Sequence, residues 1–376
     1  MNRFAIKTEL FFGPRAAGAL GELPYRRVLV VTDGFLASSG AVAKMTGRLP
    51  SQATFEVYSD VRPDPTQELV DAGVGVVERV RPDLVVAFGG GSCIDATKAI
   101  LYFAHERGLE RPYFLAVPTT AGTGSEVTDF AIITRGDDKV ALIDDFLAPD
   151  GALLDADFTR TVPPKVTVDT GLDALTHGLE AYVARGASLF TDALCVKAVS
   201  TVLAELPRVF RDGMAPGGRE AMIEASCAAG IAFTNAGLGV NHSIAHALGG
   251  RFHVAHGRLN AVLLPYVLAF HGKDACVRAR LDGLARQVGL EGCDDLAVHV
   301  GSLLDGLGVE RRLADLEAVE EGPFMEQLDS IVDAARNDRC TPMDPCTLSR
   351  QDFVNLCRDA FWGTGRQAVV HRPPTP

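Results

Sequence analysis

Two pairs of metal-ligating side chains, each four residues apart, stand out in the sequence. Asp173 and His177 form one pair, and His242 and His246 form the other. Residues four apart on a helix lie on one face, so two facing helices with such pairs can hold one divalent cation through nitrogen and oxygen ligands. A single pair would be better explained by structural or surface histidines. His256, which follows a short glycine-containing segment, adds another donor and favours a metal site.

The elements that must position these side chains are helices. From Pro163 to the end, apolar residues recur with helical periods and no convincing strand run occurs. Examples are the stretches 194–206, 221–233, 281–288 and 353–361. We therefore predict an all-helical, metal-binding domain over residues 163–376. Because a chain of 376 residues exceeds one typical core, a second domain is expected before it.

The first 162 residues alternate between predicted strands and predicted helices. Strands are expected at 9–12, 27–32, 54–58, 84–88 and 113–117, several of them as continuous apolar runs typical of strands buried on both faces. A helix is expected over 36–47, and Thr66 is expected to cap another. This alternation predicts a doubly wound, Rossmann-like α/β domain with a parallel sheet over residues 1–162.

Two segments rich in glycine and hydroxyl groups follow the last two of these strands. Residues 89–92, Gly-Gly-Gly-Ser, open a helix whose free N–H groups and positive dipole end attract phosphate. Residues 118–128 supply five hydroxyl groups and two glycines, which suit a pyrophosphate or a ribose. A tight turn or an N-capping loop would explain either segment alone, and the fingerprint G-x-G-x-x-G is absent. Two such segments on neighbouring strands favour a bound dinucleotide.

Asp33 lies at the end of the predicted strand 27–32. A carboxylate in that position accepts hydrogen bonds from the adenosine ribose and repels a ribose 2′-phosphate. Asp33 therefore favours NAD over NADP. Taken alone, Asp33-Gly34 would be better explained as a turn.

The composition excludes several other partners. A net charge of −12 disfavours nucleic acid and anionic membranes, because both require a basic surface. The first residues do not form a signal peptide, and no apolar run of about eighteen residues spans a membrane. The eight cysteines include no C-x-x-C pair, so we expect reduced thiols in a cytoplasmic protein and no cysteine-ligated zinc.

With these residues in hand, the chain resembles the iron-containing (group III) alcohol dehydrogenases. The resemblance rests on residues 89–98, 118–128 and 171–177 and on the block that holds His242, His246 and His256. It implies a dehydroquinate-synthase-like architecture, in which a dinucleotide-binding domain precedes a helical domain. It also implies an enzyme that interconverts alcohols and aldehydes with NAD(H) and one divalent metal.

The resemblance also implies a role for individual residues. The metal ligands are Asp173, His177, His242 and His256, with Fe(II) as the usual metal and Zn(II) as the alternative. His246 stands beside the nicotinamide and the substrate, where an imidazole, which ordinarily titrates near neutrality, relays the proton. The residues expected at the cofactor are Asp33, Asp64, Gly90, Gly91, Ser92, Asp95, Thr119, Thr120, Thr123, Ser125 and Lys139.

Within this family, residues 33–37, 241–246 and 249–257 are most similar to the propanol dehydrogenases of bacterial propanediol-utilisation microcompartments. This likeness implies a short-chain primary alcohol or aldehyde such as propanal as the substrate. It also implies a homodimer or larger homo-oligomer in the cytoplasm or in a microcompartment, beside other aldehyde-metabolising enzymes. Arg258 and the acidic segment 135–145 depart from this pattern and leave the substrate preference open.

Two alternatives to this interpretation remain. Another dehydroquinate-synthase-like enzyme, such as a lyase or a polyol, lactaldehyde or propanediol dehydrogenase, would use the same two domains. The segment 118–126 and the Asp173/His177 pair favour the alcohol dehydrogenases. A scaffold that binds metal and nucleotide without catalysis is disfavoured by the complete ligand and loop sets.

Other predictions concern the remaining histidines and the end of the chain. His253 is expected behind the ligands or buried, but not on the metal. Four histidines are expected at the surface: His105, His271, His299 and His371. The tail 371–376 is expected to be disordered.

Overall fold

The structure is a computed structural model of the 376-residue chain, and it describes residues 3–135 and 138–363, with the side chains of residues 138 and 139 left out. The chain divides into two compact units. The first comprises Met1–Pro163 and Gly213–Thr234, and the second comprises Pro164–Asp212 and Asn235–Pro376. The boundary that we predicted lies one residue before the end of Met1–Pro163, and the first unit additionally takes in the segment that begins at Gly213.

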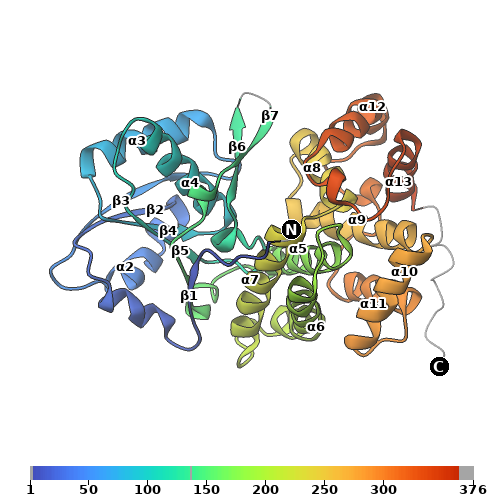
Figure 1. Ribbon diagram of the computed structural model, residues 1–376, viewed down its shortest axis with the longest axis horizontal. Helices are drawn as coiled ribbons and strands as arrows, with labels where there is room; N and C mark the ends of the chain where they lie inside the picture. The colour runs from blue at the N-terminus through green and yellow to red at the C-terminus, as the bar shows by residue number, and fades with distance from the viewer. Residues whose placement is uncertain (1–2, 136–137, 364–376) are drawn as a thin grey trace. The chain divides into compact units, whose positions relative to one another are not determined.

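The first unit is built on a six-stranded sheet in which all neighbouring strands are parallel (Figure 1). Its strands are β1 (Glu9–Phe12), β2 (Arg27–Asp33), β3 (Thr54–Val61), β4 (Leu84–Gly89), β5 (Tyr113–Pro118) and β8 (Gly151–Leu154). They lie in the order β1-β8-β5-β4-β2-β3. This arrangement confirms the predicted parallel α/β domain.

Burial explains why the sequence predicted the central strands. Every residue of β4 is buried, and so are the five central residues of β2. A strand covered on both faces needs apolar residues in succession rather than in alternation. The helices of this part are α1 (Gly34–Ser38), α2 (Ala41–Thr46), α3 (Gln67–Val80) and α4 (Gly91–Glu106). Side chains of α3 and α4 belong to one apolar core on the sheet, and side chains of α2 belong to a second core.

Two helix predictions have different outcomes. Thr66 caps α3 as predicted, because its side-chain oxygen accepts a hydrogen bond from Leu69 N at 3.4 Å. The single helix predicted over 36–47 is wrong, because α1 and α2 are separate. Gly40 lies between them with φ +84°, a left-handed conformation that ends a helix.

Three strands lie outside the predicted set. β6 (Phe130–Arg135) and β7 (Asp138–Ile143) form a separate antiparallel hairpin, and β8 adds a short strand between β1 and β5. In β6 buried residues alternate with partly exposed ones, which is a weaker signal than a continuous apolar run. β8 has only four residues, so its pattern is too short to recognise.

The order of strands gives this sheet a switch point. From β2 the chain first adds β3 on one side and then β4 on the other. In parallel α/β sheets, ligands bind at the carboxyl ends of the strands where the order reverses in this way. Asp33 ends β2 and Gly89 ends β4, so both lie at this point.

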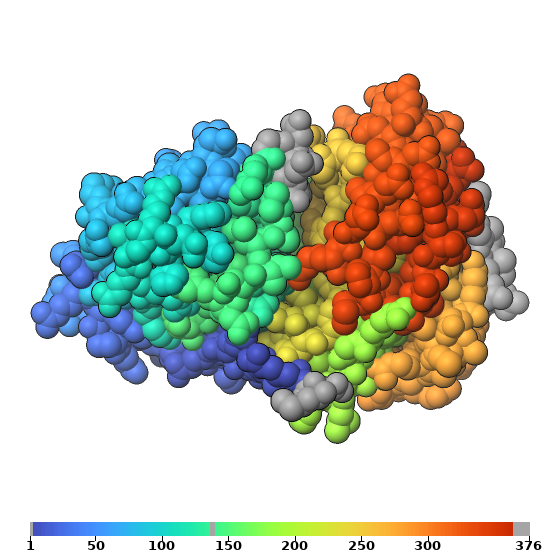
Figure 2. All heavy atoms as spheres, turned by 45° about the horizontal axis from the view of Figure 1, so that its top comes forward, coloured from blue at the N-terminus to red at the C-terminus, as the bar shows by residue number. Residues whose placement is uncertain are grey.

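The second unit is helical. Its helices are α5 (Pro164–Val183), α6 (Leu189–Arg211), α8 (Val240–Phe252), α9 (His256–His271), α10 (Ala275–Gln287), α11 (Cys293–Gly306), α12 (Glu321–Asn337) and α13 (Arg350–Trp362). Nearly all of α7 (Gly218–Ala236) belongs to the first unit. The described part of the second unit contains helices and no strand, as predicted. Figure 2 shows α12 and α13, in red, at the surface of this unit.

α5 is the central helix of the second unit. It packs against α6 and α9, and α8 packs against α9 and α12. Every residue from Gly171 to Val183 is buried. Polar side chains in such a helix are costly unless they find partners, so the carboxylates of α5 and its one histidine, His177, need partners.

Among the described residues, no single helix is both long and apolar enough to cross a membrane. Only α7 and α8 taken together, which are bent by 104° at the break between them, reach that length and composition.

Candidate active site

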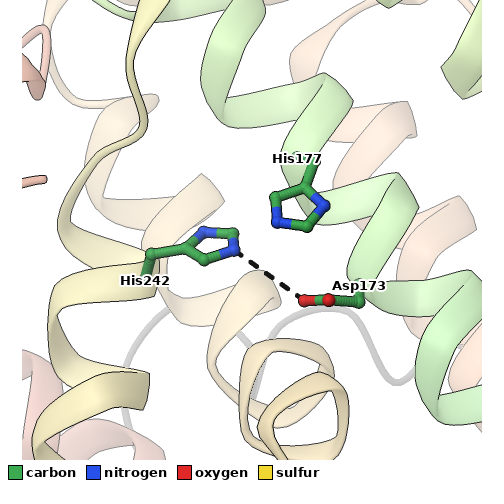
Figure 3. A group of neighbouring side chains, drawn as sticks. All are labelled: Asp173, His177 and His242. Carbon is green, nitrogen blue, oxygen red and sulfur yellow. Dashed lines mark ion pairs between the residues drawn. The ribbon is translucent and has the colours of Figure 1, made fainter. Parts of the chain in front are cut away.

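Side chains from α5 and α8 converge in the second unit. Asp173 and His177 lie one turn apart on α5, and His242 points toward them from α8 (Figure 3). One ligand atom from each of the three lies within 4.8 Å of the others, and all three residues are buried. His242 Nε2 lies 3.8 Å from Asp173 Oδ1. Three of the four predicted ligands therefore share one point.

His256, the first residue of α9, lies beside this group. Its Nε2 is 3.6 Å from Asp173 Oδ1, and its ring centroid is 5.3 Å from that of His242. Its side chain is 38% exposed, whereas that of Asp173 is 4% exposed. The close approach of α9 to α5 depends on Gly257, because a Cβ there would lie 2.1 Å from the carbonyl oxygen of Asp169.

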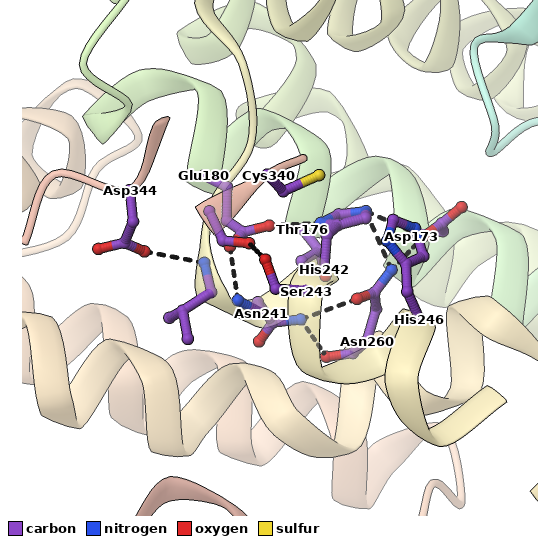
Figure 4. Close-up of polar contacts among 12 residues, drawn as sticks. Asp173, Thr176, Glu180, Asn241, His242, Ser243, His246, Asn260, Cys340 and Asp344 are labelled. Atoms are coloured by element: carbon purple, nitrogen blue, oxygen red, sulfur yellow. Dashed lines mark hydrogen bonds and ion pairs between the residues drawn. The ribbon is translucent and has the colours of Figure 1, made fainter. Parts of the chain in front are cut away.

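Asn260, one turn after His256, is a site residue that the sequence patterns did not single out. Its Nδ2 lies 2.7 Å from Asp173 Oδ1 and 3.0 Å from Nε2 of both His242 and His256 (Figure 4). Acceptor atoms of three predicted ligands thus converge on one donor nitrogen. The spacing of four residues from His256 is the signal that would have revealed Asn260.

This set of donor atoms fits a divalent cation. One carboxylate and three imidazoles suit Fe(II) or Zn(II). Ligation requires neutral imidazole, and burial, followed by the neighbouring His177 and His256, lowers the pKa of His242 well below its usual value. The acceptor atoms of Asp173, His242 and His256 that meet at Asn260 Nδ2 would also attract a cation.

Glu180 lies on the other side of the His242 ring. His242 Nδ1 is hydrogen-bonded to Glu180 Oε2, and Asn241 N donates to Oε1 at 2.8 Å (Figure 4). A ring that donates from Nδ1 keeps its Nε2 lone pair free for a cation. Burial, followed by Asp344, raises the pKa of Glu180 well above its usual value. Glu180 follows Asp173 by seven residues, so helical spacing would have revealed it.

His246 lies one turn after His242 and has a different environment. Its ring centroid is 5.1 Å from that of His256 and 6.0 Å from that of His242. His246 Nδ1 lies 2.9 Å from Asp338 Oδ2. Burial would raise the pKa of Asp338, but the hydrogen bond and the charge of His246 outweigh it and lower this pKa to about 2. His246 thus has a carboxylate partner, which sequence spacing gave no means of finding.

The two glycine-rich segments meet in the first unit. A Cβ on Gly90 would lie 3.2 Å from Thr120 Oγ1, and one on Gly91 would lie 2.9 Å from Thr123 Cγ2. Among the described residues no side chain caps α4 at Gly90, so its first N–H groups remain available to a phosphate. Ser92 is the second residue of α4, and Thr119 N donates to the Gly89 carbonyl at 3.0 Å.

α4 is tied to the segment that follows β5. Ser125 Oγ donates to one oxygen of Asp95, and Ile132 N donates to the other at 3.0 Å. The fully buried Lys98 donates to the carbonyl oxygens of Thr128 and Phe130 at 2.8 and 2.9 Å. Asp95 and Ser125 therefore hold the two segments together, and a contact with the cofactor stays a prediction for them.

The other predicted cofactor residues are less closely grouped. Asp33 accepts from Leu36 N at 2.8 Å and so caps α1, and its second oxygen is 3.8 Å from Cys93 Sγ. Asp64 is exposed in the turn after β3, with φ +54°. Lys139 belongs to β7, but its side chain is outside the described part of the structure.

Two of the remaining histidine predictions are wrong. His253 ends α8 in a left-handed conformation and is exposed, so its predicted burial is wrong, and a place behind the ligands stays a prediction. His271 is 2% exposed and lies 3.2 Å from Asp344, so it is not a surface residue. His105 and His299 are exposed as predicted, and His371 and the tail lie outside the described residues. Arg258 is buried and forms ion pairs with Asp169 and Glu310.

The fold and the clustered side chains define a class of protein. A parallel sheet with glycine-rich segments at its switch point, followed by a helical unit with a carboxylate–histidine cluster, is the organisation of a metal-dependent dehydrogenase. Comparison with protein families agrees. The profile of iron-containing alcohol dehydrogenase matches residues 7–156, and the C-terminal profile of the Fe-containing alcohol dehydrogenase family matches residues 167–361.

Individual relatives support the same assignment. The chain is 38% identical to the 1-propanol dehydrogenase PduQ of Salmonella typhimurium, over 96% of this chain and 100% of that protein. It is 42% identical to PduQ of Citrobacter freundii, over 81% of this chain and 82% of the relative. It is 34% identical to an NADPH-dependent butanol dehydrogenase of Clostridium saccharobutylicum, over 97% and 99% of the two chains.

Solved structures show the same architecture. The iron-containing alcohol dehydrogenase of Thermococcus thioreducens superposes with a TM-score of 0.91 at 30% identity, over 96% of this chain and 100% of that one. The sulfoacetaldehyde reductase of Bifidobacterium kashiwanohense, solved in complex with NAD+, gives 0.88 at 26% identity, over 97% and 100%. The chain belongs to the iron-containing alcohol dehydrogenase family, and it is an oxidoreductase that interconverts alcohols and aldehydes.

Proposed function

We propose that this enzyme reduces short-chain aldehydes such as propanal to primary alcohols, and catalyses the reverse reaction, with NAD(H) and one divalent metal ion. The observation that carries the proposal is the convergence of Asp173, His177 and His242 on one point. The likeness to PduQ supports propanal and propanol as the substrate pair. Lactaldehyde is the second candidate, because the chain is also 34% identical to an Escherichia coli lactaldehyde reductase.

The proposed metal ligands are Asp173, His177, His242 and His256. A cation held there would supply a Lewis acid for the substrate oxygen. One carboxylate leaves a divalent ion with a net charge of about +1, which favours an oxyanion. Fe(II) is proposed from the family, and Zn(II) is the alternative that the same ligands accept.

The two histidines of α8 are proposed to have different tasks. Glu180 fixes the His242 ring so that Nε2 faces Asp173. His246 holds and moves the proton of the substrate hydroxyl, and Asp338 accepts from its Nδ1 and stabilises the protonated ring. The partial exposure of His246 lets it exchange this proton with water.

The dinucleotide is proposed to bind across the carboxyl ends of β2, β4 and β5, where its nicotinamide supplies or accepts the hydride. The amino end of α4 and the threonines of residues 118–128 would hold the pyrophosphate. Asp33 would face the adenosine ribose and favour NAD(H). The NADPH-dependent butanol dehydrogenase is the relative that makes NADPH the alternative to be tested.

A homodimer or larger homo-oligomer is proposed, together with a place in the cytoplasm or in a propanediol-utilisation microcompartment. The basis is the likeness to PduQ. Other aldehyde-metabolising enzymes would then be its neighbours.

A steady-state assay tests the proposed reaction. Protein purified without oxygen and loaded with Fe(II) is given propanal, butanal and lactaldehyde with NADH or NADPH. We expect the highest kcat/KM with propanal and NADH. Asp33→Gly should raise kcat/KM with NADPH relative to NADH, and Asp129→Gly serves as a matched control. No oxidation of either cofactor with any aldehyde would contradict the proposal.

A further inference from the structure

A second group of metal-ligating side chains lies in the helical unit and shares no residue with the proposed ligands of the active site. It consists of His271 at the end of α9 and of Asp344 and Cys346 between α12 and α13. One ligand atom from each residue lies within 4.8 Å of the others. His271 and Asp344 are 2% and 0% exposed, and Cys346 is partly exposed.

The imidazole and the carboxylate already have a separation that suits a shared cation. His271 Nε2 lies 3.2 Å from each oxygen of Asp344. Two ligand atoms that each lie about 2.1 Å from a tetrahedral zinc ion are roughly 3.4 Å apart. A cation can therefore replace the proton between His271 and Asp344 with little movement of either residue.

Asp344 keeps a lone pair for this purpose on each oxygen. Oδ1 accepts from Cys346 N at 2.9 Å, and Oδ2 accepts from Val240 N at 2.8 Å. Each carboxylate oxygen has two lone pairs, so these backbone contacts leave one on each. Binding of a cation and capping of α8 by Asp344 are thus compatible.

Cys346 supplies a third ligand of a different chemical kind. Burial, followed by Asp344, raises the pKa of its thiol to about 11. A bound cation opposes this effect, because ligation stabilises the thiolate and releases the proton. Cys346 is also the one member of the group that is partly exposed to solvent.

We propose that His271, Asp344 and Cys346 form a second divalent-metal site, selective for zinc, with the fourth position open to water. A thiolate and an imidazole together prefer zinc to the harder ions magnesium and calcium. Arg185 is a cation close to the group. Its guanidinium donates to the Asp344 carbonyl oxygen at 2.6 Å and to Thr347 Oγ1 at 3.0 Å. Neither of these oxygens is a proposed metal ligand.

This site connects to the active site through one helix. Asp344 accepts from the first N–H of α8, and α8 carries His242 and His246. The carboxylate is therefore shared between the cap of α8 and the proposed second ion. Occupancy by zinc should stiffen the amino end of α8.

Cobalt(II) distinguishes the two sites by spectroscopy. A thiolate bound to Co(II) gives an intense charge-transfer band in the near ultraviolet, whereas histidine and carboxylate ligands do not. Protein stripped with a chelator and reloaded with excess Co(II) should show this band and two cobalt ions per chain. Cys346→Ser should lose the band and one of the two ions. Circular dichroism checks that this variant is folded.

Two matched cysteine variants complete the test. Cys276→Ser replaces an exposed cysteine of α10, and Cys340→Ser replaces the cysteine that lies close to Asp338. Both should keep the band. Absence of the band from the wild-type protein, or its persistence in Cys346→Ser, would overturn the proposal. Neither outcome depends on alcohol dehydrogenase activity, so the second site is tested independently of the proposed reaction.

Discussion

The two histidines of α8 repeat one arrangement in two environments. His242 directs Nδ1 at Glu180, and His246 directs Nδ1 at Asp338. The side chains of the first pair are 1% and 3% exposed, whereas those of the second are 30% and 16% exposed. The same contact between a ring and a carboxylate is therefore dry in one case and open to water in the other.

The difference in solvent exposure indicates which role suits each pair. A buried ring with a fixed partner keeps one tautomer and one orientation, which is what a metal ligand requires. A partly exposed ring can exchange its proton with solvent, which is what a proton relay requires. Burial, rather than the type of residue, separates the two proposed roles, and the following variants test that separation.

The largest effect is expected from Asp173→Ala. Asp173 supplies the carboxylate that lies near both His242 and His256, so its loss removes a ligand and its negative charge. Removing a residue that only hydrogen-bonds a ligand lowers metal affinity by up to roughly 100-fold. The loss of Asp173, a ligand itself, should lower the affinity further and abolish activity. Metal analysis after dialysis measures this. Normal metal content in the variant would exclude Asp173 as a ligand.

His246→Ala should behave differently, although it alters the same helix. We expect the metal content to stay normal and kcat to fall by about 10²–10⁴-fold, the usual contribution of a proton-transfer group. Steady-state kinetics and metal analysis of one preparation give both values. Loss of metal from this variant would move His246 into the ligand set and remove the contrast between the two histidines.

Glu126 provides a buried carboxyl in the other unit for comparison with both pairs. Burial is the main cause that raises its pKa from 4.5 to about 7, although its own N–H and Lys98 oppose the shift. Below about pH 4.5 the Glu126 carboxyl is neutral in both the folded and the unfolded protein. Because the unfolded chain ionises first, the free energy of unfolding falls as the pH rises from 4.5 to about 7, by about 3 kcal/mol.

Glu126→Gln should remove this dependence on pH. Urea unfolding from about pH 4 to about pH 8 should show the variant gaining stability relative to the wild type as the pH rises. Asp129→Asn, three residues away and partly exposed, is the control. A constant difference between Glu126→Gln and the wild type would mean that Glu126 titrates normally.

Glu180→Gln tests the buried pair of His242 and Glu180 directly. The amide keeps a hydrogen-bonding group beside His242 Nδ1 but cannot ionise. Metal affinity should fall by about 10- to 100-fold, with little change in kcat at saturating metal. Competition with a chelator measures the affinity. A fall in kcat without a change in metal affinity would contradict the role given to Glu180.

The smallest effect is expected from Asp338→Asn. Water can reach His246 and replace part of the lost interaction, so kcat should fall by about 10-fold while metal affinity is unchanged. Steady-state kinetics and metal analysis of one preparation measure both values. An unchanged kcat would show that Asp338 does not assist His246.

Local patterns were sufficient to predict much of the molecule. The buried runs of β2, β4 and β5 identified the parallel sheet, and helical spacing identified Asp173, His177 and His242. Both signals arise within a few residues of the chain. The hairpin β6–β7 was missed because buried residues of β6 alternate with partly exposed ones, which is a weaker signal than the continuous apolar runs of β4 and β5.

The partners of the histidines depend on packing between distant segments. Asp338 is 92 residues from His246 in sequence, and Asp344 is 73 residues from His271. Only the packing of helices in the second unit brings them together, so no spacing rule finds them. His271 was expected at the surface because most histidines with no visible partner are exposed, and its buried carboxylate reverses that expectation.

The most direct test of the central claim uses one preparation in two states. The protein is stripped of metal with a chelator, assayed with propanal and NADH, and assayed again after Fe(II) or Zn(II) is restored. The account predicts no measurable NADH oxidation by the stripped protein and recovery in proportion to the metal bound in wild type but not in Asp173→Ala. Full activity of the stripped protein would contradict the account.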